Sequence, residues 1–183
     1  MDLVILDRDG VINYDSPDFI KSPTEWRAIP GSLEAIAALT NAGVRVAIAT
    51  NQSGIGRGLF SSQDLVAIHA QMLREAEVAG GAIDMIAICP HAPDDGCDCR
   101  KPRAGLLKQI AERFEHSLPL ANVPIIGDSY RDIAAARHVG GRAILVLTGN
   151  GSRTAKELRD DETLEIFADL SDAVEMLLGK DKT

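Results

Sequence analysis

The stretch VILDRDGVIN, residues 4–13, decides the fold, because an apolar run ends there in two acidic residues. Asp7 and Asp9 are separated by one residue, and Gly10 follows them directly. Burying one carboxylate beside a sheet is costly, and placing a second like charge there costs more. On the pair alone, a solvated Asp-Gly turn and a metal site explain the pattern equally well. The rest of the sequence has to distinguish them.

The composition is that of a globular protein, and we expect one domain spanning residues 1–183. The chain is 45% hydrophobic and 25% charged, with a formal net charge of −8. No apolar run approaches the roughly 20 residues that cross a bilayer, and the first residues lead directly into the acidic motif. We therefore expect a cytoplasmic, monomeric protein without a membrane partner. The lack of a broad positive field argues against nucleic acid as a partner.

Short apolar runs alternate with longer segments of helical periodicity, which predicts an α/β fold. Strands are expected at 2–6, 44–50, 84–89, 123–128 and 142–148. Helices are expected at 32–42, 61–81, 104–114, 130–141, 153–159 and 171–178. The nearly continuous apolar strands indicate a Rossmann-like, doubly wound parallel sheet with helices on both faces and no large cap domain. The long irregular segments 10–30 and 89–103 follow strand ends, where such sheets bind ligands.

Polar side chains follow four of the expected strands, and in a parallel sheet these ends meet at one edge. They are Asp7, Asp9, Thr50, Asn51, Cys89 and Asp128. The motif GDSYRD, residues 127–132, adds a third carboxylate after an apolar strand and favours a Mg²⁺ site over a solvated turn. Asp132 either orients these groups or is a first-turn acid that the helix dipole stabilises.

A carboxylate held beside Mg²⁺ can attack phosphorus and form an aspartyl-phosphate. Residues two apart in an extended segment face the same side, so Asp9 can deliver a proton to the leaving group. We expect Arg8, between them, to point elsewhere as a structural or surface residue. Thr50 can donate a hydrogen bond to a phosphoryl oxygen, and Lys101 can neutralise negative charge there. The alternatives are a flexible glycine-rich connection at 49–58 and an exposed loop lysine.

The segment CPHAPDDGCDC, residues 89–99, contains three thiols and one imidazole. Cys89, His91, Cys97 and Cys99 form the ligand set of a closed, structural Zn²⁺ site. Reduced cysteines beside a turn histidine are the alternative, but free cysteines prefer apolar surroundings and these lie among aspartates. We therefore predict a zinc-pinned loop that brings Arg100 and Lys101 to the pocket.

The motifs LDRDGVIN, ATNQSG, CRKP and GDSYRD resemble, in this order, the four motifs of the haloacid dehalogenase superfamily of phosphatases. With CPHAPDDGCDC, the chain is similar to the zinc-containing branch that holds heptose-bisphosphate and histidinol-phosphate phosphatases. TNQSGIGRG, residues 50–58, resembles the heptose-bisphosphate form. That form removes the 7-phosphate of D-glycero-D-manno-heptose 1,7-bisphosphate on the route to nucleotide-activated heptose for lipopolysaccharide.

The resemblance implies roles for individual residues. Asp7 would be the nucleophile and Asp9 the general acid and base, with Thr50 and Lys101 stabilising the phosphoryl group. Mg²⁺ would be held by Asp7, Asp128 and the backbone carbonyl of Asp9. The implied contacts with a small-molecule sugar bisphosphate are Asp15, Ser16, Pro17, Asp18, Asn51, Gln52, Ser53 and Arg100. Because an acidic protein needs local cations for two phosphates, Arg57 and Arg100 are candidates for the phosphate that is not cleaved.

Three other functions remain open from the sequence. A histidinol-phosphate phosphatase would run the same chemistry, and parallel turnover assays separate the two. A phospho-accepting signalling domain would keep its aspartyl-phosphate, whereas Asp9 is placed to activate water. A zinc-binding interaction module without activity is disfavoured by the complete acidic set. His69, His116, His138 and residues 150–183 are assigned no chemistry.

Overall fold

The computed structural model describes residues 1–179 and contains a six-stranded sheet in which every strand pair is parallel. The strand order is β3-β2-β1-β4-β5-β6. The strands are β1 (Leu3–Leu6), β2 (Arg45–Asn51), β3 (Met85–Cys89), β4 (Pro124–Gly127), β5 (Arg142–Val146) and β6 (Glu165–Phe167). The predicted parallel α/β fold is confirmed.

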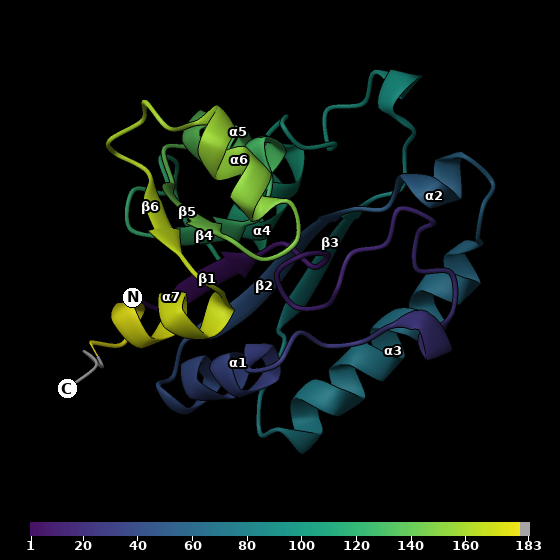
Figure 1. The fold of residues 1–183 in the computed structure, drawn as a ribbon, viewed down its shortest axis with the longest axis horizontal. Coiled ribbons are helices and arrows are strands. Elements are labelled where there is room, and N and C mark those ends of the chain that lie inside the picture. Colours follow the sequence, from purple (N-terminus) through teal and green to yellow (C-terminus); the bar gives the residue numbers. More distant parts are fainter. Residues whose placement is uncertain (180–183) are drawn as a thin grey trace.

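Helices cover both faces of the sheet (Figure 1). They are α1 (Ser32–Asn41), α2 (Ser53–Gly56), α3 (Ser62–Val78), α4 (Gly105–Arg113), α5 (Tyr130–His138), α6 (Gly151–Glu157) and α7 (Leu170–Leu177). Two short 3-10 helices, η1 (Pro23–Glu25) and η2 (Pro93–Asp95), lie in the long loops. Within the described residues no separate cap domain is inserted, as predicted.

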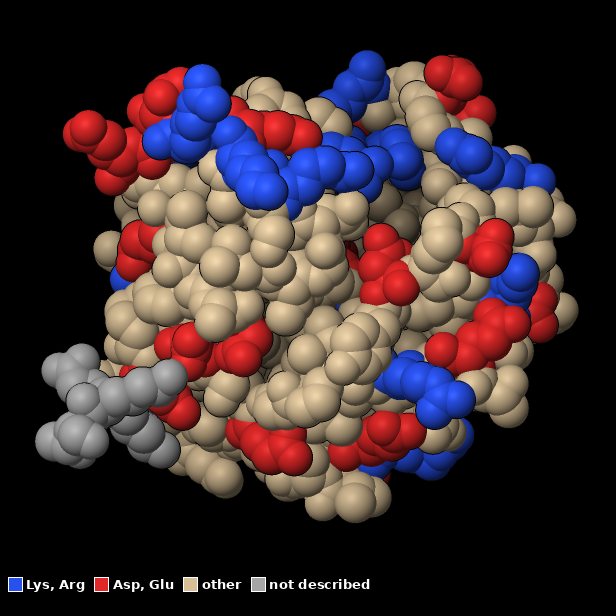
Figure 2. Space-filling model, viewed as in Figure 1, with Lys and Arg blue, Asp and Glu red and all other residues tan. Residues whose placement is uncertain are grey.

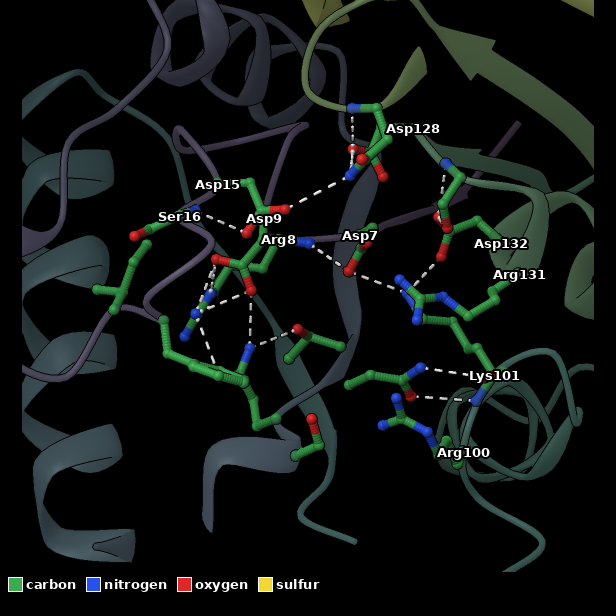
Figure 3. A pocket seen from close by; sticks show the side chains of 18 of the residues that line it. Asp7, Arg8, Asp9, Asp15, Ser16, Arg100, Lys101, Asp128, Arg131 and Asp132 are labelled. Carbon is green, nitrogen blue, oxygen red and sulfur yellow. Dashed lines mark hydrogen bonds and ion pairs between the residues drawn. The ribbon is translucent and has the colours of Figure 1, made fainter. Parts of the chain in front are cut away.

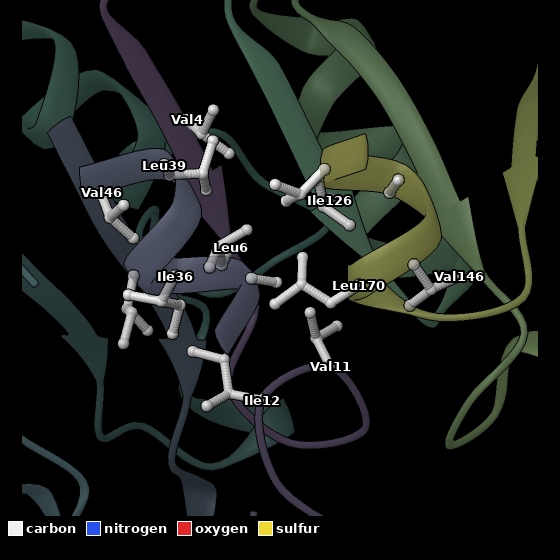
Figure 4. Close-up of a cluster of buried hydrophobic side chains, with 14 of the residues drawn as sticks. Val4, Leu6, Val11, Ile12, Ile36, Leu39, Val46, Ile126, Val146 and Leu170 are labelled. Carbon is white, nitrogen blue, oxygen red and sulfur yellow. The ribbon is translucent and has the colours of Figure 1, made fainter. Parts of the chain in front are cut away.

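Alternation of side chains along β1 builds one core on each face. Val4 and Leu6 belong to the core beneath α1, α3 and α7, which Figure 4 shows. Leu3 and Ile5 belong to the core beneath α4 and α5. All four side chains are fully buried, so β1 is the central, apolar strand that a doubly covered sheet requires.

The strand order reverses direction between β1 and β4. The chain runs outward from β1 through β2 to β3 and then returns to place β4 on the other side of β1. In open parallel sheets this reversal leaves a crevice beyond the carboxyl ends of the two strands. Asp7 follows β1 and Asp128 follows β4, so the topology itself brings the two carboxylates together.

The elements differ from the sequence-based expectations mainly at the edges. The strand β6 and the short helix α2 were not predicted, and the helix expected at 153–159 begins earlier, at Gly151. A three-residue strand is too short for its alternation to be recognised, and β6 exists because it pairs with β5. None of the helices within residues 1–179 combines the length and apolar character that a membrane crossing requires.

Candidate active site

A cavity of about 300 Å³ opens at the carboxyl edge of the sheet, above the crevice between β1 and β4. Figure 2 shows acidic side chains inside a hollow and basic side chains gathered along its rim. Figure 3 shows the acidic residues converging from separate elements. The residues that line the cavity are Asp7, Arg8, Asp9, Asp15, Ser16, Phe19, Ile20, Thr50, Asn51, Gln52, Ser53, Arg57, Pro93, Arg100, Lys101, Asp128, Ser129, Arg131, Asp132 and Asn150.

The Asp7 carboxylate is held from one side by a buried lysine. Lys101 Nζ lies 2.9 Å from Asp7 Oδ1 and 2.6 Å from Asp132 Oδ1, and it donates to the Ala49 carbonyl at 2.6 Å. The Arg8 amide also donates to Asp7 Oδ1, at 2.7 Å. Lys101 is therefore a fixed charge between two carboxylates, and Asp7 Oδ2 remains open toward the cavity.

The loop after β5 fixes Asp128. Its Oδ2 accepts hydrogen bonds from the Asn150 backbone amide at 2.7 Å and from Asn150 Nδ2 at 3.1 Å. A Cβ on Gly10, whose φ is +83°, would lie 2.2 Å from Asp128 Oδ2. Only glycine both adopts this backbone conformation readily and leaves space for the carboxylate.

The carboxylates suit a hard dication. Asp7, Asp128 and Asp132 each offer an oxygen, and these oxygens lie within 4.8 Å of one another. Burial raises the pKa of Asp7 to about 8 despite Lys101, and burial raises the pKa of Asp128 to about 6. Protein groups alone therefore do not neutralise the negative charge of these two carboxylates. A Mg²⁺ ion bound by their oxygens would do so. Asp132 is occupied by Lys101 and by the Ser129 hydroxyl at 2.5 Å, so Asp7 and Asp128 are the better ligands.

Arg8 is fully buried, which corrects the expectation that it could be a surface residue. Its guanidinium group turns back onto Asp9, donating to Oδ1 at 2.8 Å and to Oδ2 at 2.9 Å. Asn13 and Gln52 also donate to Asp9, each at 2.9 Å. Burial opposes ionisation of Asp9, but Arg8 and these hydrogen bonds outweigh it and hold the pKa below its ordinary value.

The carboxyl end of β2 and the residues that follow it connect the two halves of the site. Gln52 Nε2 also donates to Thr50 Oγ1 at 2.9 Å, and Thr50 is buried at the cavity wall. The side-chain amide of Asn51 pairs with the backbone of Lys101: Oδ1 accepts from the Lys101 amide at 3.0 Å, and Nδ2 donates to the Lys101 carbonyl at 3.1 Å. The Asn51 side chain therefore positions the lysine loop, while Ser53 lines the cavity.

The loop at 15–20 is only partly at the cavity. Asp15 and Ser16 line it, but Pro17 and Asp18, predicted as contacts, are not among its lining residues. Phe19 lines it instead, with a φ of 64° that is unusual for a bulky residue. A side chain held in a strained conformation at a cavity wall is a frequent feature of binding sites.

Besides the buried Arg8, three arginines line the cavity: Arg57, Arg100 and Arg131. The Arg57 guanidinium carbon lies 5.9 Å from the centre of the Phe19 ring. Arg100 donates to the His91 carbonyl at 3.4 Å. Burial and the positive charge of Arg131 lower the pKa of Arg100, so the two guanidinium groups are close enough to repel each other.

The predicted zinc ligands form a second cluster beside the cavity. Cys89 Sγ lies 3.6 Å from both Cys97 Sγ and His91 Nδ1, and His91 Nδ1 lies 3.2 Å from Cys99 Sγ. With Zn–S bonds of about 2.3 Å, tetrahedral geometry separates two sulfur ligands by about 3.8 Å. The donor set and its spacing therefore fit Zn²⁺ with every position closed by protein.

Asn150, Arg131 and Ser129 belong to the cavity wall but were not predicted. Asn150 comes shortly after β5, so the strand-end signal that identified the other residues also applies to it. Arg131 lies inside the motif GDSYRD, of which only the two aspartates were interpreted from the sequence. The acidic core was recognisable because its motifs are local, whereas the rim depends on which loops the fold places beside it.

Comparisons with known proteins support the same class. The HAD-hydrolase-like family model matches residues 98–173. The D-glycero-beta-D-manno-heptose-1,7-bisphosphate 7-phosphatase of Bordetella bronchiseptica is 51% identical to this chain, over 97% of this chain and 98% of that protein. The protein of the same name from Pseudomonas aeruginosa is 49% identical, over 96% and 97%.

A solved structure is also very similar. The D,D-heptose 1,7-bisphosphate phosphatase of B. bronchiseptica, complexed with magnesium and phosphate, superposes with a TM-score of 0.94 at 50% identity, covering 98% of this chain and 99% of that chain. Fold and site thus define a hydrolase of the HAD-like class. Within that class, the chain belongs to the heptose-1,7-bisphosphate 7-phosphatase family.

Proposed function

We propose that this protein is a Mg²⁺-dependent phosphatase that removes the 7-phosphate of D-glycero-beta-D-manno-heptose 1,7-bisphosphate. The proposal is supported mainly by the site, where Asp7, Asp128 and Lys101 lie together at the point where the strand order reverses. The chain is also about 50% identical to phosphatases of that name. Relatives at 49–51% identity bear the beta name, whereas the alpha-named relative of Mycobacterium bovis is 35% identical. This difference favours the beta anomer.

Asp7 attacks the phosphorus of the 7-phosphate in the first step. A bond forms between an Asp7 carboxylate oxygen and phosphorus, and the bond from phosphorus to the sugar oxygen breaks. Lys101 and Thr50 carry the charge that develops on the phosphoryl oxygens. Asp7, Asp128 and the backbone carbonyl of Asp9 would hold Mg²⁺, which when bound neutralises the carboxylates and polarises the phosphoryl group.

Asp9 moves the protons in both steps. Arg8 and the hydrogen bonds to Asp9 keep its pKa low in the protein alone, and we propose that Asp9 takes up a proton as the phosphate enters, because a nearby negative charge raises the pKa of a carboxyl group. The proton then passes to the departing sugar oxygen. In the second step Asp9 removes a proton from water, the water oxygen bonds to phosphorus, and the bond to Asp7 breaks to release inorganic phosphate.

We also propose that Cys89, His91, Cys97 and Cys99 bind a structural Zn²⁺. The metal would supply cross-links within residues 89–99 and would take no part in phosphoryl transfer. The loop then presents Lys101 to Asp7 and Arg100 to the cavity rim. The uncleaved phosphate is expected at that rim, for which Arg57 and Arg100 are the candidates from sequence.

Phosphate release, measured with Mg²⁺ on both anomers of the heptose bisphosphate and on histidinol phosphate, tests the proposal. We expect the highest kcat/KM on the beta bisphosphate. Asp7→Asn should reduce kcat by at least about 10⁴-fold, while the fold and the bound zinc persist. Faster turnover of histidinol phosphate, or a stable phosphoprotein without turnover, would contradict it.

A further inference from the structure

Arg131 is a cation without a protein partner at the cavity rim. It is the second residue of α5 and is exposed. Its side chain forms no hydrogen bond or ion pair with any residue between 1 and 179, and its charge reaches Asp15 only at longer range. Figure 3 shows it beside Lys101 and Asp132, at the edge of the acidic site.

Neither the helix on which Arg131 stands nor its arginine neighbour favours a cation at this position. The amino end of a helix carries partial positive charge, so a cation in the first turn of α5 is destabilising. Arg100, from the zinc loop, brings a second guanidinium close to it. Asp15 attracts Arg131 only at longer range, whereas an anion bound between the two guanidinium groups would contact both of them.

Arg100 and Arg131 also share a second hollow that the other arginine does not line. A groove of about 340 Å³ adjoins the cavity on the side of the zinc loop, and both residues line the cavity and the groove. Arg57 lies against Phe19 and lines the cavity but not the groove, and its charge acts on Arg100 less than that of Arg131 does. An anion between Arg100 and Arg131 would therefore sit where the cavity meets the groove.

We propose that Arg131, with Arg100, binds the phosphate that is not cleaved, and that Arg131 makes the enzyme selective for a bisphosphate. The inference rests on the proposed function, because it assigns a residue to the second phosphate of that substrate. It changes the expected pair at the rim from Arg57 and Arg100 to Arg131 and Arg100. Guanidinium groups suit this task since they donate two parallel hydrogen bonds to a phosphate.

The test compares D-glycero-D-manno-heptose 1,7-bisphosphate with the 7-phosphate of the same sugar. The two share the phosphate that is cleaved and differ only in the second one. We expect Arg131→Gln to raise KM for the bisphosphate by about tenfold or more, which is the size of a lost charge-assisted hydrogen bond. Its kcat should change little, since this contact is made equally before and during phosphoryl transfer. Turnover of the 7-phosphate should stay within about twofold of the wild type.

Two further variants make the result specific. Arg137→Gln removes the same charge from the opposite end of α5, where Arg137 pairs with Asp161, and should leave both substrates unaffected. Arg131→Lys keeps the charge but loses the paired hydrogen bonds, so its KM should fall between those of the wild type and Arg131→Gln. Equal losses on both substrates in Arg131→Gln would mean that Arg131 supports the catalytic groups, and would overturn the inference. Loss of the preference in Arg57→Gln alone would overturn it as well.

The substrate preference of the wild-type enzyme distinguishes failure of this inference from failure of the proposed function. If it prefers the bisphosphate and Arg131→Gln keeps that preference, the role of Arg131 is rejected and the proposed function stands. If the wild type itself turns over both sugars equally, the proposed substrate and the role of Arg131 are both rejected.

Discussion

Arg8 holds the carboxylate of Asp9, the proposed acid/base, in place, and residues distant in the sequence hold Arg8 in turn. Its guanidinium group binds Asp9, lies 3.2 Å from His69 Nε2 and donates to Gln52 Oε1 at 3.3 Å. His69 comes from the middle of α3, so this helix supplies part of the environment of Arg8. Since an arginine only donates, His69 must accept at Nε2 and stay neutral.

The pH dependence of stability should report this neutral histidine. Burial and the charge of Arg8 lower the pKa of His69 to about 4 from its usual 6.5. Between those pH values the unfolded chain binds a proton that the folded chain does not, so stability is lost as the pH falls. The contribution approaches about 1.4 kcal/mol per pH unit.

Urea unfolding of the wild type and of His69→Gln at pH 4.5, 5.5 and 7 measures this contribution. Glutamine can still accept from Arg8 but does not titrate, so the variant should lose less stability on acidification. Because Asp7 and Asp128 also titrate, the difference between the two proteins is the informative quantity. Identical pH profiles would refute a neutral, buried His69.

The zinc loop is the element on which the site depends most. It begins at the end of β3 with Cys89 and leads to Lys101 and then to α4. Arg103 donates to the carbonyl groups of Gly96 and Cys97, at 2.5 and 2.6 Å, and so closes the loop on itself. Apart from η2 the loop contains no regular structure, so the four proposed zinc ligands would be the main constraint on its shape.

Removing one of these ligands should weaken catalysis at a distance. Cys97→Ser is expected to lower the zinc content, the melting temperature and kcat, the last by roughly tenfold or more because outer contacts of this kind position the catalytic lysine. Metal analysis by mass spectrometry, thermal unfolding and phosphate release measure the three effects. Asp94→Asn, on the same loop but outside the cluster, is the matched control and should behave as the wild type. Full activity in a zinc-free Cys97→Ser protein would contradict the proposed role of the loop.

At the scale of the whole molecule, the fold concentrates uncompensated negative charge at one point. The reversal of strand order gathers Asp7 and Asp128 from strands far apart in the sequence. Their raised pKa values mean that folding buries carboxylates at a cost. A Mg²⁺ ion held by these carboxylates, as proposed above, would therefore link function to stability.

Mg²⁺ should accordingly stabilise the folded protein. A ligand that binds only the native state adds about 2.7 kcal/mol to the free energy of unfolding at one hundred times its dissociation constant. Thermal unfolding in MgCl₂, compared with NaCl at equal ionic strength, should show a higher melting temperature. The increase should shrink in Asp128→Asn, which removes one ligand charge. An equal response of the variant and the wild type would place the metal elsewhere.

The sequence by itself determined the sheet, the acidic centre and the cysteine cluster. Apolar periodicity is a local property, so it identifies β1 and β4, and parallel strand ends meet at one edge wherever the helices lie. Asp7 and Asp128 could therefore be placed together before any coordinates, and Lys101 was assigned to the same site because the other motifs were present. The four proposed zinc ligands lie within eleven residues, so their clustering is encoded locally as well.

The tertiary structure alone decided the partners of these groups. Three contacts join segments that are well separated in the chain. Arg8 is buried against His69, Asn150 donates to Asp128, and Arg131 lies near Arg100. No local pattern encodes such contacts, because the environment of a side chain depends on which distant elements pack beside it. Charge and burial at a site are properties of that packing, and the sequence therefore predicted the chemistry of the site better than its surroundings.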